Sequence, residues 1–167
     1  MTSAPSSARP RRSRFSWLLA TLFGIGFLKP GPGTWASAAT VALWWLPARH
    51  ASIADLWLYT ALAAAVVTIL GVPVCTVVAE ESGIADPSFA VIDEVAGQLI
   101  ALAAVPRQWQ YVLGSFILFR GFDIFKPPPL RKLERIPGGG GIMLDDVGAG
   151  IYAFIVMQTV AYFHLLR

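Results

Sequence analysis

Long apolar runs separated by short polar stretches dominate this chain, and one of these runs carries two adjacent acidic residues. That run is Phe89–Val105, where Asp93 and Glu94 interrupt a hydrophobic pattern. If the run is a helix, successive side chains point about 100° apart, and Gln98 lies one turn beyond Glu94. Carboxylates in such a run are costly unless they are paired, hydrated or bound to a cation. The pattern therefore predicts a helix whose two acids meet partners from elsewhere in the chain.

The other apolar runs predict further helices, interrupted by proline, glycine and acidic residues. Phe15–Leu28 is short for a membrane span and is followed by no convincing cleavage site, so we expect a retained interfacial or re-entrant helix. Thr34 is expected to cap the next helix, and Pro47 to end it. Glu80–Ser88 is expected to be a polar loop and Ile136–Asp146 a glycine-rich loop. The further helices are expected at Thr34–Leu46, Asp55–Ala79, Tyr111–Phe122 and Val147–Leu166.

Composition makes this a membrane protein. Hydrophobic residues form 56% of the 167 residues and charged residues 14%, whereas a soluble domain is nearer one quarter charged. Mean hydropathy is +0.62. We therefore predict an all-α, polytopic helical membrane protein with about four to five membrane-embedded helices. Residues 15–167 are expected to form a single domain, preceded by a disordered, arginine-rich tail at residues 1–14.

Counting membrane crossings predicts where the polar stretches meet. If the four later helices each cross the bilayer, the helix ending at Glu80 and the helix beginning near Asp93 share one face. The helix ending at Asp123 and the helix beginning at Asp146 share that same face. The stretch Lys29–Thr34 joins them if the helix that follows it also inserts. Acids from distant parts of the chain are therefore predicted to gather into one site.

The net charge of +3 includes two basic clusters, one at residues 9–14 and one at residues 126–135. Basic segments beside apolar ones stay on the cytoplasmic side of a membrane, which predicts a site that faces the cytoplasm. The partner expected for these clusters is the lipid bilayer, through anionic headgroups. Nucleic acid is not an expected partner, because no aromatic pattern or nucleic-acid-binding fold accompanies the basic residues.

The gathered polar residues are suited to a metal and a phosphate. An all-oxygen set without histidine or cysteine favours magnesium, manganese or calcium. The metal-ligand candidates are Asp93, Glu94, Asp123, Asp145 and Asp146. Basic side chains and glycine-rich backbone can hold phosphate oxygens. The phosphate-binding candidates are Lys29, Thr34, Arg120, Lys126, Gly139 and Gly140. Together these groups indicate phosphoryl chemistry on a lipid headgroup.

Each of these features has a plainer interpretation on its own. Asp93 and Glu94 could be a helix-start pair facing water, Arg120 and Asp123 an intrahelical salt bridge, and Asp145–Asp146 a helix cap. Two further hypotheses explain the group differently: a small cation transporter or channel subunit that uses clustered carboxylates, and a non-catalytic membrane scaffold. The position of the acids in the membrane distinguishes the transporter from the phosphatase. A transporter is expected to have acids at several depths across the membrane, whereas the crossing count places these acids at one face.

The phosphatase designs that need other residues are absent from the sequence. There is no Cys-x5-Arg loop for a cysteine nucleophile, no Asp-x-Asp pair near the N-terminus, and no histidine near the acids. The design that remains is water activated by a metal ion, with a carboxylate accepting the proton.

Four motifs resemble the signature blocks of the phosphatidylglycerophosphatase A family. They occur in the family's order over roughly residues 28–152, and they are Lys29–Ser37, Asp86–Gln98, Arg120–Pro127 and Gly138–Val147. The resemblance implies an all-helical, magnesium-dependent, multi-pass phosphatase of the bacterial inner membrane. Members of this family convert phosphatidylglycerophosphate to phosphatidylglycerol and phosphate.

The resemblance also implies that the five acids act in metal binding and catalysis, without stating which of them is the general base. Our hypothesis makes Asp93, Asp123 and Asp146 metal ligands, and makes Glu94 the base or a further ligand. The phosphate would be held by Arg120, Lys126 and Lys29.

Overall fold

The computed structural model describes residues 12–163, apart from the side chain at position 53. Most of the tail predicted at residues 1–14 lies outside the described residues, as does the end of the helix predicted at Val147–Leu166. The described part contains helices and no strand, which confirms the all-α prediction. The elements are α1 (Arg14–Ala20), η1 (Ile25–Phe27), α2 (Pro32–Ala48), α3 (Ile53–Ser82), α4 (Ile92–Leu102), α5 (Trp109–Phe125), α6 (Leu130–Leu133) and α7 (Gly139–Tyr162).

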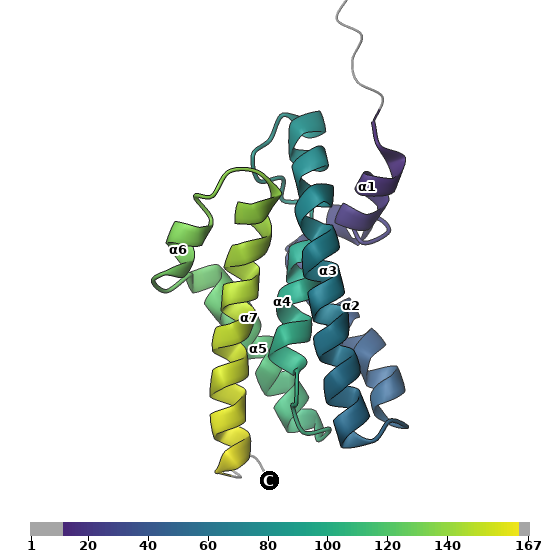
Figure 1. Ribbon diagram of the computed structural model, residues 1–167, viewed down its shortest axis with the longest axis vertical. Coiled ribbons are helices and arrows are strands. Elements are labelled where there is room, and N and C mark those ends of the chain that lie inside the picture. The colour runs from purple at the N-terminus through teal and green to yellow at the C-terminus, as the bar shows by residue number, and fades with distance from the viewer. Residues whose placement is uncertain (1–11, 164–167) are drawn as a thin grey trace, which may run out of the picture.

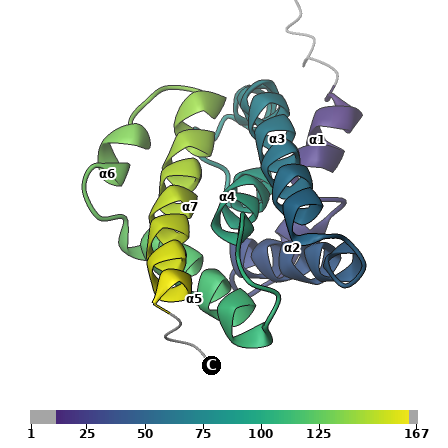
Figure 2. The same ribbon diagram turned by 60° about the horizontal axis from the view of Figure 1, so that its bottom comes forward.

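The short helix α4 lies at the centre of the bundle. The long helices α3 and α7 run along the length of the molecule in opposite directions, with α4 between them (Figure 1). Seen toward the end of the bundle, α4 is surrounded by α2, α3, α5 and α7 (Figure 2), and it contacts all four. Most of its residues are consequently buried, including Asp93 and Gln98. The two acids of α4 therefore start from a position inside the fold.

Glycines let the backbones of these helices approach one another closely. A Cβ at Gly150 of α7 would overlap the carbonyl of Gly97 on α4, and its distance to the Gly97 Cα would be 3.0 Å. At the start of α7, a Cβ at Gly139 would overlap the carbonyl of Val72 on α3, and the Gly139 N–H donates a 2.9 Å hydrogen bond to Thr76 Oγ1. Small residues at such contacts are typical of helices packed in membranes. They bring the acids of α7 beside those of α4.

Two helices of the described chain are long and apolar enough to cross a membrane, Ala54–Ser82 and Gly139–Tyr162. Large apolar side chains on these helices face outward, among them Ile69, which is 70% exposed, and Ile155, which is 55% exposed. Apolar surface of this kind is costly in water and favourable in lipid. The finding supports membrane association, and the count of four to five embedded helices stays a prediction.

Several helix boundaries differ from the sequence prediction. The glycine-rich loop predicted at Ile136–Asp146 is wrong, because α7 already begins at Gly139, and Asp145–Asp146 lie inside the helix instead of capping it. Pro47 does not end α2, which continues through it to Ala48. A proline in the last turn removes few backbone hydrogen bonds, so the helix accommodates it. Thr34 does not cap α2 either, because Gly31 occupies the N-cap position.

The N-terminal half differs in two further places. Phe15–Leu28 is not one helix: α1 ends at Ala20, and turns lead to the single-turn η1. The expected loop Glu80–Ser88 begins later than predicted, because α3 continues to Ser82. Glu81 is therefore helical, and its carboxylate accepts hydrogen bonds from the N–H of Ser13 at 2.9 Å and from Nε1 of Trp17 at 2.7 Å. These bonds attach α1 to the end of α3.

The remaining predicted helices are correct in position and inexact in length. The run Phe89–Val105 forms the shorter α4, and the run Tyr111–Phe122 forms the longer α5, which includes Asp123. The single-turn α6 was not predicted. It lies in the basic stretch after α5, beside the start of α7, and its Leu130 is buried there. The connection between α5 and α7 is thereby held close to the acids.

Candidate metal and phosphate site

Three carboxylates from two helices meet at the centre of the bundle. Asp93 and Glu94 lie in the first turn of α4, and Asp146 lies in the second turn of α7. Each offers an oxygen atom, and these atoms all lie within 4.8 Å of one another. Asp93 is 8% exposed and Asp146 3%. The plainer interpretation of Asp93 and Glu94 as a water-facing pair is therefore wrong for Asp93.

The protein itself supplies little to offset this concentration of negative charge. The partial positive charge at the start of α4 favours acids in its first turn. Even so, Asp93 Oδ1, Glu94 Oε2 and Asp146 Oδ2 are buried without a hydrogen-bond partner in the described chain. Buried carboxylates with free oxygens are strongly unfavourable unless a cation neutralises them. All three donors are hard oxygen atoms, which suit magnesium or calcium. The residues therefore fit a divalent cation.

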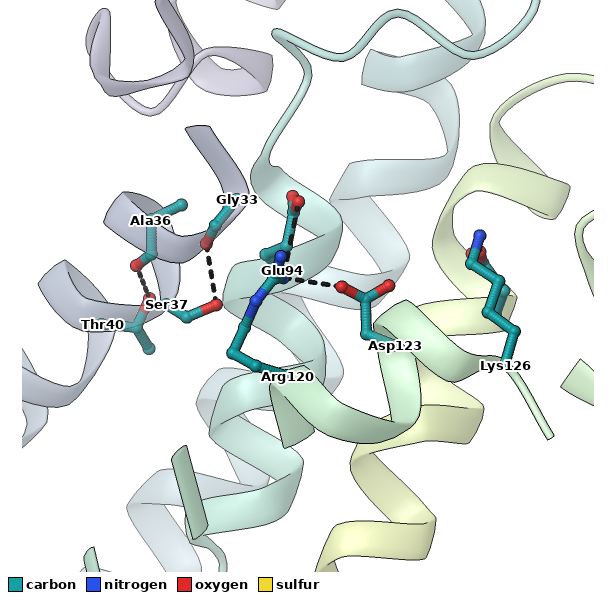
Figure 3. A network of polar contacts seen from close by, with 9 residues as sticks. Gly33, Ala36, Ser37, Thr40, Glu94, Arg120, Asp123 and Lys126 are labelled. Atoms are coloured by element: carbon teal, nitrogen blue, oxygen red, sulfur yellow. Dashed lines mark hydrogen bonds and ion pairs between the residues drawn. The ribbon is translucent and has the colours of Figure 1, made fainter. Parts of the chain in front are cut away.

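Helix α5 places the positively charged side chain of Arg120 beside this cluster. Arg120 Nη1 lies 2.7 Å from Asp123 Oδ2 and 3.8 Å from Glu94 Oε1. Figure 3 shows the guanidinium between the two carboxylates. The Arg120–Asp123 contact is the intrahelical pair that the i, i+3 spacing indicates, whereas the Arg120–Glu94 contact joins α5 to α4. Arg120 Nε is buried and has no hydrogen-bond partner in the part of the chain that the structure describes, so the guanidinium keeps a donor for a further anion.

Lys126 holds the other acid of α7. It ends α5 with a left-handed backbone conformation, and its Nζ lies 2.7 Å from Asp145 Oδ2 and 3.1 Å from Glu134 Oε1. Burial lowers the pKa of Lys126, but the hydrogen bonds and charges of these two carboxylates outweigh it and hold the pKa above its usual value. Lys126 is therefore protonated and positively charged at neutral pH. Asp145 and Asp146 are neighbours in sequence that face different partners.

The start of α2 contacts the cluster through its backbone. A Cβ at Gly33 would overlap Glu94 Oε1 and would lie 3.1 Å from Arg120 Nη1. The carbonyl of Gly33 also accepts a 2.9 Å hydrogen bond from Ser37 Oγ (Figure 3). Glycine is needed at this position because the chain passes directly over the Glu94 carboxylate. The motif that begins at Lys29 thus reaches the site through Gly33.

The other phosphate-binding candidates lie in varied positions. Lys29 and Thr34 are exposed, and Lys29 has no acid within ion-pair distance among residues 12–163. Gly139 is buried, with its N–H donated to Thr76, and Gly140 is half-buried. Gln98 is fully buried, and its Nε2 lies 3.5 Å from Ser115 Oγ on α5. Although Gln98 lies one turn beyond Glu94, no hydrogen bond joins the two side chains within residues 12–163.

One residue near the site was missed by sequence reasoning. Glu134 follows α6 and pairs with Lys126. It lies within the basic stretch at residues 126–135, for which the expected partners were lipid headgroups and, at Lys126, a phosphate. In the sequence, Glu134 lies one helical turn after Arg131, and this spacing does not indicate a partner such as Lys126 on the other side of a turn in the chain. The contact depends on the turn that contains Pro127 and Pro129.

Fold and site together define a helical protein with two candidate membrane spans and a candidate oxygen-only cation site flanked by arginine and lysine. The chain belongs to the phosphatidylglycerophosphatase A family, whose model matches residues 18–161. The family resemblance of the four motifs is thereby confirmed. Its members are phosphoric monoester hydrolases, and the chain is an enzyme of that class.

Relatives over most of the chain carry two kinds of name. A phosphatidylglycerophosphatase A of Haemophilus influenzae is 41% identical over 150 residues, covering 89% of this chain and 90% of its own. The protein of the same name from Escherichia coli is 33% identical, covering 97% and 95%. A putative phosphatidylinositol-3-phosphatase of Bacteroides thetaiotaomicron is 40% identical, covering 87% and 92%. No solved structure matches the chain significantly.

Proposed function

We propose that this protein is a magnesium-dependent lipid phosphatase that converts phosphatidylglycerophosphate to phosphatidylglycerol and phosphate. The observation that carries the proposal is the cluster of Asp93, Glu94 and Asp146. Its oxygens lie within 4.8 Å of one another, and one oxygen of each residue is buried without a hydrogen-bond partner among the described residues. The family assignment supports the substrate, because two relatives are named for that activity.

The roles of the residues follow from their surroundings. A bound magnesium ion lowers the pKa of water and offsets charge on phosphate oxygens. Asp93 and Asp146 are the most buried acids of the cluster and are proposed to hold the ion, with Asp123 as a further ligand. Glu94, at the edge beside Arg120, is proposed to accept the proton of the attacking water. The phosphorus–oxygen bond to the glycerol breaks as the water oxygen adds, and the leaving alkoxide takes up the proton that Glu94 accepted, which returns Glu94 to its carboxylate form.

The cationic side chains are proposed to bind the phosphate. Arg120 lies 3.8 Å from Glu94, so a phosphate held by its guanidinium would lie beside the proposed base. Charge-assisted contacts from arginine are strong and directional. Lys126, now paired with Asp145 and Glu134, and Lys29, which is exposed, could complete the contacts from either side. Thr34, Gly139 and Gly140 stay predicted phosphate contacts, and Gly139 would have to release its N–H from Thr76 to make one through its backbone.

The position of the site suits a substrate that stays in the membrane. The acids lie near the start of α7 and the start of α4, and α5 ends there. We propose that the shorter helices are embedded beside the two long ones, which gives a multi-pass protein of the bacterial inner membrane. The basic residues that follow α5 favour the cytoplasmic side for this end. The phosphate then reaches the site while the acyl chains remain in the bilayer.

Phosphate release from purified protein in vesicles tests the proposal. Phosphatidylglycerophosphate and phosphatidylinositol 3-phosphate are compared at equal surface concentration, with magnesium and with EDTA. We expect release from phosphatidylglycerophosphate that stops in EDTA, and slower release from the inositol lipid. Faster release from the inositol lipid would change the substrate assignment. An absence of release from any lipid phosphomonoester would favour a transporter or a scaffold.

A further inference from the structure

An apolar groove between α2 and α3 begins beside the carboxylate cluster. Val95 and Leu99 of α4 line it, and Val95 directly follows Glu94 in the chain. The groove has a volume of about 330 Å³, which is within the usual range for a small-molecule site. Its lining on α2 runs from Thr40 to Pro47 and its lining on α3 from Leu56 to Ala63, so the groove leads from Val95 toward the turn between α2 and α3.

Apart from Tyr59 at the rim, the hydrogen-bonding side chains that line the groove already have partners. Trp44 Nε1 donates to Thr60 Oγ1 at 2.8 Å, and Thr60 Oγ1 donates to the carbonyl of Leu56 at 2.7 Å. Thr40 Oγ1 donates to the carbonyl of Ala36 at 2.9 Å (Figure 3). These three side chains offer no free donor hydrogen to a ligand. A hydrocarbon chain fits such a lining, whereas a polar ligand would lose its hydrogen bonds with water.

The groove is open along its side. Leu43 on α2 is 64% exposed and Tyr59 on α3 is 62% exposed, and both form part of its rim. From Thr40 to Pro47 the groove follows α2 for about 10 Å, from the rise of a helix per residue. A chain can therefore enter sideways from the bilayer, without passing over the polar end of the bundle.

We propose that this groove binds one acyl chain of the lipid substrate while its phosphate lies at the carboxylates. The proposal rests on the proposed function, because it needs a substrate that carries both groups. A second apolar groove, of about 660 Å³, lies between α3 and α7. Its lining begins farther from the acids, at Ile100 and Ile151, each more than a turn beyond the nearest acid of its helix. No residue that lines the second groove is adjacent in sequence to an acid of the cluster, so this groove serves as the comparison.

Two matched substitutions on α3 separate the grooves. Ala63 lines the groove beside the site, and Ala65 lines the second groove. Two residues apart, they face roughly opposite sides of the helix. Ala63→Phe and Ala65→Phe add the same side chain. The measurement is kcat/KM for dioleoyl phosphatidylglycerophosphate and for its deacylated, water-soluble form. The ratio of the two values reports acyl-chain binding and is independent of the amount of folded enzyme.

We expect Ala63→Phe to lower this ratio about tenfold through a higher KM for the dioleoyl lipid. Ala65→Phe should leave the ratio within about twofold of the original. An unchanged ratio in Ala63→Phe, or an equal fall in both variants, would overturn the proposal. If Ala63→Phe loses activity on both substrates, Ala63→Leu replaces it, and an equal loss there would show a purely structural role. Absence of phosphate release by the unsubstituted protein would instead contradict the proposed function.

Discussion

Arg120 and Asp123 connect the carboxylate cluster to the phosphate-binding side of the site. The guanidinium is 2.7 Å from Asp123 and 3.8 Å from Glu94, so it is shared unequally between two acids. Removing the charge of Asp123 would let Glu94 pair more closely with Arg120. That pairing would occupy both the proposed base and the proposed phosphate donor. Asp123 therefore matters for the site whether or not it also touches the metal.

Asp123→Asn is expected to fold and insert, and to lose at least about 100-fold in phosphate release at every magnesium concentration, as in other sites that lose a group stabilising the transition state. The comparison is Asp55→Asn, which removes a carboxylate at the start of α3 that is bonded to Ser52. That variant should stay within about twofold of the original activity. Near-normal turnover by Asp123→Asn would contradict a role for the Asp123 carboxylate in the site.

At the scale of helices, the site depends on how closely α7 packs against α4. Gly150 lies one turn beyond Asp146 on α7 and touches the backbone of Gly97 on α4. A side chain at this contact would separate the two helices, and with them the acids that they carry. Protein interiors tolerate such overpacking poorly. The backbone contact therefore sets the distance between Asp146 and the α4 pair.

Gly150→Ala is expected to lower the free energy of unfolding by about 1–3 kcal/mol and to weaken magnesium activation. Gly121→Ala on α5 is the control, because its Cβ would meet no atom within 4 Å in the described chain. Both changes raise intrinsic helix propensity equally, so the difference in thermal unfolding in detergent isolates the helix contact. Equal stability of the two variants would contradict this role for Gly150.

The sequence predicted the helical class, the order of the long helices and the acids that gather. It did so because apolar runs and the spacing of their polar interruptions determine which helix ends meet. It failed where packing overrides local preference. Gly139 and Gly141 are poor helix formers and suggested a loop, but they lie in the first turn of α7. Larger residues there would collide with α3 and with the preceding turn, so the close packing of this turn requires glycine.

Other features had no local signal. The single-turn α6 and the pairing of Glu134 with Lys126 depend on how the chain turns after α5. The apolar groove beside Val95 depends on the separation of α2 from α3, which the apolar pattern of either helix does not reveal. Contacts between segments distant in sequence determine these features, and a single sequence encodes them only weakly.

At the scale of the whole molecule, the polar site and the opposite end of the bundle should lie on different sides of the membrane. The turn between α3 and α4 lies at the site end, and the turn between α4 and α5 lies at the opposite end (Figure 1). The basic stretch between α5 and α7 belongs to the site end. The positive-inside rule therefore predicts that this end faces the cytoplasm.

Cysteine labelling in intact cells tests this orientation. The native Cys75 is buried, so single cysteines can be introduced in each turn. Ile84→Cys lies in the exposed turn at the site end, and Gln108→Cys in the exposed turn at the other end. We expect a membrane-impermeant maleimide to label Gln108→Cys in intact spheroplasts, and to label Ile84→Cys only after lysis. The reverse pattern would place the site on the outer side.

The central claim is that the cluster of Asp93, Glu94 and Asp146 is a divalent-cation site in which Asp93 and Asp146 hold the ion. Manganese is a hard cation with similar oxygen ligands and can be followed by electron paramagnetic resonance. A titration of the purified protein with manganese, repeated for Asp146→Asn and for Asp55→Asn, measures binding without any substrate. We expect saturable binding that magnesium displaces, weakened at least about tenfold in Asp146→Asn and unchanged in Asp55→Asn. Equal affinity in the unsubstituted protein and Asp146→Asn would contradict the account.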